Sequence, residues 1–244
     1  MTQPNWPFLG LRDPISSSTH AAAFLCAILA TLFLLRLGRR HGVRSLSLAV
    51  FGFSLMFLYG ASATYHALQL PPNGIKFFKL LDHSAIYLLI AGTHAAISRL
   101  LPQTGFQRGL LAVVWTVAVI GIGSEWLLPA PPYSLTVSVY VFMGWLGVLT
   151  LMPLLQTVGL RGVQWLVYGG LAYTTGALVD LLEWPVVLPG VFSHHELFHL
   201  LVMLGSFCHF VFVFRFVAPF KQSRASRSPV RASAASLQPQ PAGV

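Results

Sequence analysis

The sequence has few charged residues, which make up 9% of its 244 residues, whereas soluble domains carry roughly 25%. Acidic side chains are the scarcest, with six Asp and Glu residues in total. Apolar residues account for 55% of the chain and gather in long runs. This composition excludes an ordinary soluble domain. It predicts one integral membrane domain with several spans.

Cysteines are few, and no cleavable signal peptide is expected. The two cysteines, Cys26 and Cys208, fall inside apolar runs. We therefore expect buried thiols there rather than a disulfide framework or a cysteine metal site. Residues 1–18 are polar and contain proline, and no basic start leads into an early apolar run with a small-residue cleavage site. No cleaved signal peptide is therefore expected.

Seven apolar runs make up most of the chain, and each can cross about 30 Å of hydrocarbon at 1.5 Å per residue. We predict an all-α integral membrane protein with a seven-transmembrane helix bundle over residues 19–220 and a kink at Pro153. A polar segment over 1–18 and a disordered basic tail over 221–244 flank it. The predicted spans are Thr19–Leu37, Leu46–Leu70, Phe77–Leu101, Gly109–Leu128, Tyr133–Leu155, Gly162–Leu182 and His194–Phe220.

Basic residues are unevenly divided between the two sides of this bundle. The side with the odd-numbered loops and the tail holds twelve of the 15 Lys and Arg residues, and the other side holds three together with all six acids. The positive-inside rule therefore predicts a cytoplasmic C-terminus in the plasma (bacterial inner) membrane. We expect the net charge of +9 to interact with membrane lipid. Nucleic acid is not an expected partner, because the apolar runs leave no basic face to bind it. The three basic residues on the poorer side are Arg12, Lys76 and Lys79.

Four ionisable residues are predicted to meet at the N-terminal side of the membrane. His195 and His199 are four residues apart, so on a helix they share one face and can bind one divalent metal. His66 ends the second span and Asp82 begins the third, at the same depth. Three histidines leave a position open for water, whereas a closed structural zinc site has four protein ligands. Asp82 would either be a fourth ligand or hold that water and take its proton. Ser62, one turn before His66, could hydrogen-bond the ligands or a substrate carbonyl.

Each of these residues also has a simpler interpretation. His66 alone would be a hydrogen-bonded interior histidine, and Asp82 a loop carboxylate paired with Lys79. His195 and His199 alone would be an interfacial pair. Their convergence at one depth on three spans favours the metal site over these separate readings.

The other histidines are not expected to bind the metal. His41 lies on the opposite side, and His209 lies too deep. His83 points about 100° away from Asp82 on a helix. We expect His194 to face solvent or headgroups, and nothing in the sequence ties His20 to the cluster.

Three motifs together resemble the hemolysin III family, the bacterial branch of the progestin and adipoQ receptor family that includes the adiponectin receptors. They are S-x-x-x-H at Ser62–His66, L-D-H-S-A-I-Y-L-L-I-A-G-T at Leu81–Thr93 and H-E-L-F-H-L at His195–Leu200. The resemblance covers roughly residues 19–217. It implies a seven-helix fold that binds zinc through the histidines matching His66, His195 and His199, with the aspartate matching Asp82 near a zinc-held water.

The wider superfamily includes alkaline ceramidases, so the resemblance implies a metal-dependent hydrolase that acts on a membrane lipid amide such as a ceramide-like substrate. One alternative is a membrane receptor or regulator with a structural zinc. The other is a cytolysin, as the family name suggests, which fits less well because the spans carry no charged stripe to line a pore.

The chain departs from the family pattern at two positions. His94 stands where a tyrosine is usual and is expected to be structural. Asp180 stands where an apolar or aromatic residue is expected, and would be a polar wall of the cavity or a partner of Lys79. Adiponectin receptors place their N-terminus in the cytoplasm, which is opposite to the orientation that the charges of this chain predict. We keep the orientation predicted from the charges, because a fold does not fix orientation.

Orientation can be measured with reporters fused to the C-terminus. The excess of basic residues on one side, twelve against three, predicts a cytoplasmic C-terminus. A reporter that is active only in the cytoplasm should therefore give a signal, and a reporter that is active only outside should give none. The reverse pattern would invert the orientation and move the histidine cluster to the cytoplasmic face.

Overall fold

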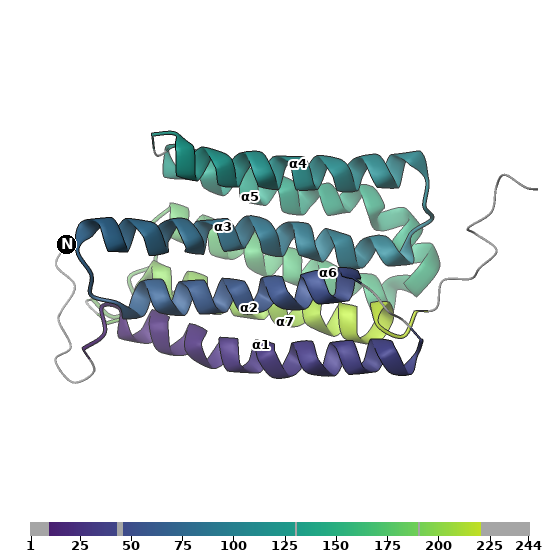
Figure 1. Cartoon of the computed structure of the whole chain (residues 1–244), viewed down its shortest axis with the longest axis horizontal. Helices are drawn as coiled ribbons and strands as arrows, with labels where there is room; N and C mark the ends of the chain where they lie inside the picture. The colour runs from purple at the N-terminus through teal and green to yellow at the C-terminus, as the bar shows by residue number, and fades with distance from the viewer. Residues whose placement is uncertain (1–9, 43–45, 130, 190, 221–244) are drawn as a thin grey trace, which may run out of the picture.

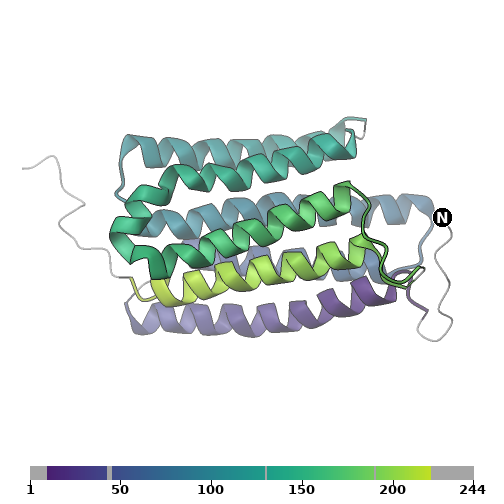
Figure 2. The same ribbon diagram turned by 180° about the vertical axis from the view of Figure 1, so that it is seen from behind.

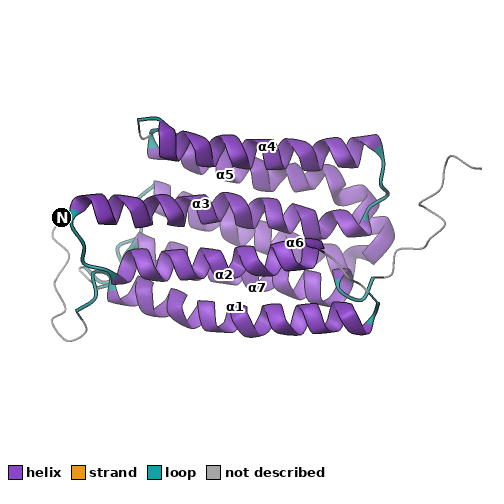
Figure 3. Cartoon of the chain, viewed as in Figure 1, coloured by secondary structure: helices purple, strands orange, loops and turns teal. Residues whose placement is uncertain are grey.

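The computed structural model describes residues 10–42, 46–129, 131–189 and 191–220, and these residues are almost entirely helical (Figure 3). Their helices lie side by side along one long axis, with loops at the two ends (Figure 1). The seven α-helices of these ranges are α1 (Pro14–Arg40), α2 (Leu46–Ala67), α3 (Pro72–Ile97), α4 (Gly105–Leu127), α5 (Tyr133–Trp145), α6 (Leu151–Leu181) and α7 (His194–Phe212). Two 3-10 turns, η1 (Ser98–Leu100) and η2 (Leu146–Thr150), follow α3 and α5, and a π-helical turn, η3 (Val213–Val217), follows α7.

Six helical segments in the described ranges are long and apolar enough to cross a membrane, which confirms an all-α membrane protein. The segments differ from the seven predicted spans because Tyr133–Leu181 is one segment of 49 residues that contains both α5 and α6. A straight helix of that length would measure about 74 Å, more than twice the hydrocarbon thickness of about 30 Å. The segment is not straight, because its backbone is non-helical at Gly159 and the chain turns back before the long part of α6 (Figure 2).

The predicted kink at Pro153 is not where the chain reverses. Pro153 lies in the first turn of α6, where the missing N–H of proline leaves no hydrogen bond unmade. The helix of α5 already ends at Trp145, and the non-helical backbone within α6 is at Gly159, with φ 66° and ψ −177°. Glycine reaches this left-handed φ without a steric cost. The predicted span Tyr133–Leu155 therefore covers α5, η2 and the first residues of α6, and only the kink at Pro153 is wrong, because the break in the helix is at Gly159.

The first and third helices begin earlier than their apolar runs. α1 starts at Pro14, five residues before Thr19, and α3 starts at Pro72, so proline stands at the start of both helices. The predicted polar segment 1–18 therefore contains the first turn of α1. The predicted disordered tail, 221–244, lies outside the described residues.

The main apolar core lies between α1, α2, α3 and α7, and a smaller one between α3, α4 and α5. α1 and α2 approach closely where Thr31 meets Gly52. The Thr31 hydroxyl donates to the carbonyl oxygens of Ala27 at 2.7 Å and Gly52 at 3.1 Å. A Cβ added at Gly52 would lie 2.4 Å from Thr31 Cγ2, so glycine is needed at this contact.

The variant Gly52→Ala tests this contact. Because Thr31 is short, buried and hydrogen-bonded, the added methyl must push α1 and α2 apart, at a cost of about 1–3 kcal/mol. Thermal unfolding in detergent should shift to a lower temperature. Gly123→Ala in α4, where an added Cβ meets nothing within 4 Å, should be neutral or stabilising by up to about 1 kcal/mol. Equal melting of the two variants would contradict the assignment.

Candidate metal centre

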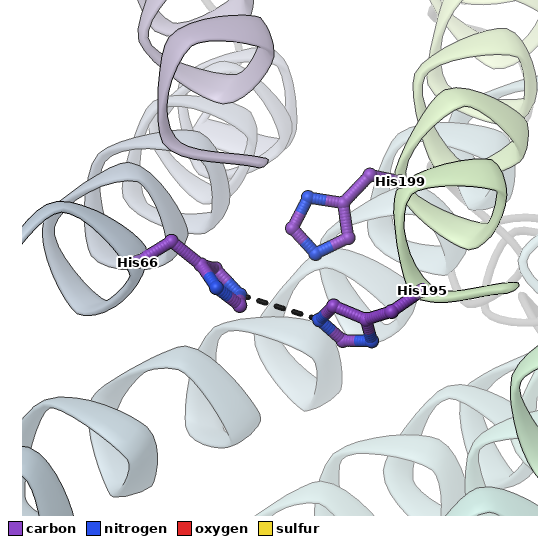
Figure 4. A group of neighbouring side chains, drawn as sticks. All are labelled: His66, His195 and His199. Atoms are coloured by element: carbon purple, nitrogen blue, oxygen red, sulfur yellow. Dashed lines mark hydrogen bonds between the residues drawn. The ribbon is translucent and has the colours of Figure 1, made fainter. Parts of the chain in front are cut away.

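The three predicted metal-binding histidines lie at the ends of two helices (Figure 4). His66 is in the last turn of α2, and His195 and His199 are in the first two turns of α7. A capping box fixes where α7 begins: the Ser193 hydroxyl oxygen accepts from the His195 N–H, and Glu196 accepts from the Ser193 N–H at 2.8 Å. This start places both α7 histidines toward the end of α2.

The ligand nitrogens of the three histidines lie within 4.8 Å of one another. His66 and His199 are 3% and 2% exposed, and the Nε2 atoms of His66 and His195 are 3.4 Å apart. The structure thus brings together the three residues that the sequence predicted. Such a group could hold one metal ion.

Two carboxylates set the chemistry of this donor set. Nδ1 of His66 is 2.8 Å from Asp13 Oδ2, and Nδ1 of His195 is 2.9 Å from Asp180 Oδ1. A carboxylate only accepts, so each Nδ1 carries a hydrogen, and in the neutral rings each Nε2 presents a lone pair. Two lone pairs facing each other repel unless a proton or a cation lies between them. The arrangement fits a metal ion, since metal-binding histidines commonly donate their other N–H to a carboxylate.

Sequence reasoning missed this role for both carboxylates. Asp13 lies in no motif that points to this role, although it precedes the first helix on the same side as the histidines. Asp180 was noticed, but it contacts His195, His194 at 3.3 Å and the Tyr133 hydroxyl, and no pair with Lys79 is among the ion pairs of the described residues.

Asp13 lies before α1 and is itself held by two bases. Burial alone would raise the pKa of its carboxyl group, but the hydrogen bonds and charges of His66 and Arg12 outweigh burial and hold that pKa below its usual value. The backbone N–H groups of Arg12 and Asp13 also donate to the carbonyl oxygens of Ala67 and His66, at 3.2 and 2.9 Å. The start of α1 is thereby tied to the end of α2.

Asp82 and Ser62 line the same cavity as the three histidines. Ser62 is 2% exposed and lies beside Asp82. Asp82 is not part of the group of mutually close ligand atoms. The alternative in which Asp82 pairs with Lys79 finds no support, because no such pair occurs within 4 Å among the residues described.

Two other histidines lie closer to the cluster than expected. His20 is 3% exposed, and its ring stacks on His199 with centroids 3.9 Å apart, so it belongs to the packing around the site. His194 contacts Asp180 and does not simply face solvent. His83 reaches the other way, toward Glu125 at 3.4 Å, in agreement with its exclusion from the site.

A cavity of about 690 Å³ extends from the histidine cluster into the bundle. It is lined by residues of α3, α5, α6 and α7, and along α6 it reaches from Asp180 to Leu151. Away from the cluster the lining is largely apolar, with side chains such as Ile86, Val141, Leu154 and Val202. A cavity of this size and character suits an apolar ligand with one polar end.

The fold and the site together define an all-helical integral membrane protein with a three-histidine group, able to hold a metal ion, at one end of an internal cavity. A family model described as "Haemolysin-III related" matches residues 9–210. Hemolysin-3 of Bacillus cereus is 34% identical over 212 residues, which are 86% of this chain and 94% of that protein. A Hemolysin-3 homolog of Bacillus subtilis (strain 168) is 31% identical over 201 residues, 80% of this chain and 90% of the relative. The chain belongs to the hemolysin III family, as its motifs predicted.

Metal content tests the three-histidine group directly. Purified protein should carry about one metal ion per chain, because three imidazoles form one site. His66→Ala, His195→Ala and His199→Ala should each remove most of it, measured by elemental analysis. His41→Ala, at the opposite end of the bundle, is the matched control. Full occupancy in the His195→Ala, His199→Ala double variant would reject the site.

The carboxylates can be tested in the same way. Asp13→Asn and Asp180→Asn should weaken metal binding by roughly 10- to 100-fold, because each replaces the carboxylate that orients a histidine with an uncharged and weaker acceptor. Competition with a chelator of known affinity measures the change. Glu183→Gln removes the same charge at the same end of the bundle without touching a histidine contact. An equal loss in that control would assign the effect to net charge alone.

Proposed function

We propose that the protein is a zinc-dependent membrane hydrolase that cleaves an amide bond of a membrane lipid. One observation carries the proposal: the three-histidine group and Asp82 lie together at one end of a largely apolar internal cavity. The polar end suits a reacting carbonyl group, and the remainder suits an acyl chain. The family membership agrees with this reading.

Zinc is the metal that this donor set favours. Imidazole nitrogens are good zinc ligands, and three protein ligands leave a position for water. A bound zinc ion would supply a nucleophilic water near neutral pH and polarise the substrate carbonyl. Asp13 and Asp180 hold two of the imidazoles in the orientation that the metal requires.

Asp82 is the proposed general base. It lines the cavity but stays outside the group of ligand atoms, so it is free to accept the proton of the attacking water and pass it to the leaving nitrogen. Ser62, beside Asp82, would orient that carboxylate. The apolar wall excludes bulk water from the reacting bond.

We also propose seven spans with a cytoplasmic C-terminus. The segment Tyr133–Leu181 is too long for one crossing, and the chain reverses within it (Figure 2), which supports two spans. The histidine cluster then lies toward the outer face, because the ends of α2 and α6 and the starts of α3 and α7 share that side. The uneven distribution of Lys and Arg sets the direction.

The variant Asp82→Asn separates catalysis from metal binding. It keeps the size of the side chain but removes the base. Zinc should therefore be retained, and hydrolysis of ceramide or another N-acyl lipid should fall by roughly 100-fold or more. Zinc content and turnover are measured on the same preparation.

Three other outcomes are informative. A parallel loss of zinc would make Asp82 a ligand. Unchanged turnover with zinc retained would reject Asp82 as the base. A zinc-loaded wild type without turnover on any lipid amide would favour a receptor with a structural zinc.

A further inference from the structure

Two histidines line the cavity far from the metal centre and have no role in the proposed hydrolysis. His94 in α3 lies twelve residues beyond Asp82, and His209 in α7 lies ten residues beyond His199. At 1.5 Å per residue these positions are about 18 Å and 15 Å further into the bundle. Because α3 and α7 both start at the end that holds the histidine cluster, the two imidazoles reach similar depths.

Hydrogen bonds fix which nitrogen of each ring is protonated. His94 Nε2 is 3.0 Å from the Met143 carbonyl oxygen, and His209 Nε2 is 3.3 Å from the Leu166 carbonyl oxygen. A carbonyl only accepts, so each Nε2 carries the hydrogen and each Nδ1 of the neutral ring is an acceptor. Within the described ranges no hydrogen bond reaches either Nδ1 atom. The cavity thus has two unsatisfied acceptors at its inner end.

Glycines and an aromatic ring hold these imidazoles in place. A Cβ added at Gly169 would lie 2.3 Å from His209 Cδ2, and one at Gly147 would lie 3.6 Å from His94 Cε1. The Tyr173 ring packs edge-on against His209 at 5.3 Å. The two rings are therefore fixed by their neighbours, and polar groups fixed in an apolar membrane interior are costly unless a ligand uses them.

We propose that His94 and His209 form a second subsite that binds a hydroxyl group partway along a lipid chain. The proposal rests on the proposed function, which places the reacting end of the lipid at the metal centre. A hydroxyl group carries one hydrogen, so it donates to one of the two Nδ1 acceptors at a time. The residues that line this part of the cavity are uncharged, which favours a neutral donor over an ammonium group. The preferred substrates are then amides of hydroxylated acyl chains, because a plain chain leaves the acceptors unpaired.

Ricinoleate and oleate are a matched pair of probes, because they share the chain and the double bond and differ by one mid-chain hydroxyl. Equilibrium binding of each radiolabelled acid is measured on the zinc-loaded protein in nanodiscs, with empty nanodiscs subtracted. We expect wild type to bind ricinoleate roughly three- to tenfold more tightly, the effect of about one buried hydrogen bond. Equal affinities would overturn the subsite alone. Absence of binding for both acids would reject the subsite together with the lipid-chain cavity.

Variants assign the preference to the two histidines. His94→Phe and His209→Phe should each lower the ratio of affinities, and the double variant should bring it close to one, while oleate binding and zinc content are retained. His94→Gln keeps an N–H donor and adds a carbonyl acceptor, so it should preserve part of the preference. His41→Phe, at the cytoplasmic end, should keep all of it. A full preference in both Phe variants would overturn the proposal. Because binding is measured without turnover, a protein that hydrolyses nothing can still support or refute the subsite.

Discussion

Carboxylate–imidazole contacts are the constraint on which the polar end of this bundle depends. Imidazoles in an apolar interior are unfavourable unless every nitrogen has a partner. Asp13 satisfies His66 across α1 and α2, and Asp180 satisfies His195 across α6 and α7. Each contact therefore joins two helices and orients a ligand at the same time. The remaining nitrogens of these two rings, the Nε2 atoms of His66 and His195, are 3.4 Å apart, and a cation is a partner that could complete them.

This arrangement gives the cavity its polarity. At one end stand the histidine cluster, Asp82 and Ser62, and from there the lining becomes apolar toward η2 and the start of α6. A lipid would enter such a space with its head at the polar end and its chain along α3 and α7. The inner pair, His94 and His209, interrupts that apolar stretch and gives the cavity a means of distinguishing one chain from another.

The two departures from the family pattern now have physical explanations. Asp180 is more than a polar wall, because it receives hydrogen bonds from three side chains at the metal centre. His94 ties α3 to α5 through the Met143 carbonyl and still presents an acceptor nitrogen in a residue that lines the cavity. Both residues line the cavity of this chain.

The sequence by itself determined the class of the protein, its family and the three histidines that could hold a metal ion. Hydropathy fixes where helices can cross a membrane, and the spacing of His195 and His199 fixes their shared face, because both signals are local. The same local signals could not place Asp13 or His20 beside the cluster, since those contacts join residues about 50 to 180 positions apart. Nor could they show that α5 ends at Trp145, because apolar residues continue through the turn. Only tertiary packing decided which carboxylate orients which histidine, and where the cavity between the helices begins and ends.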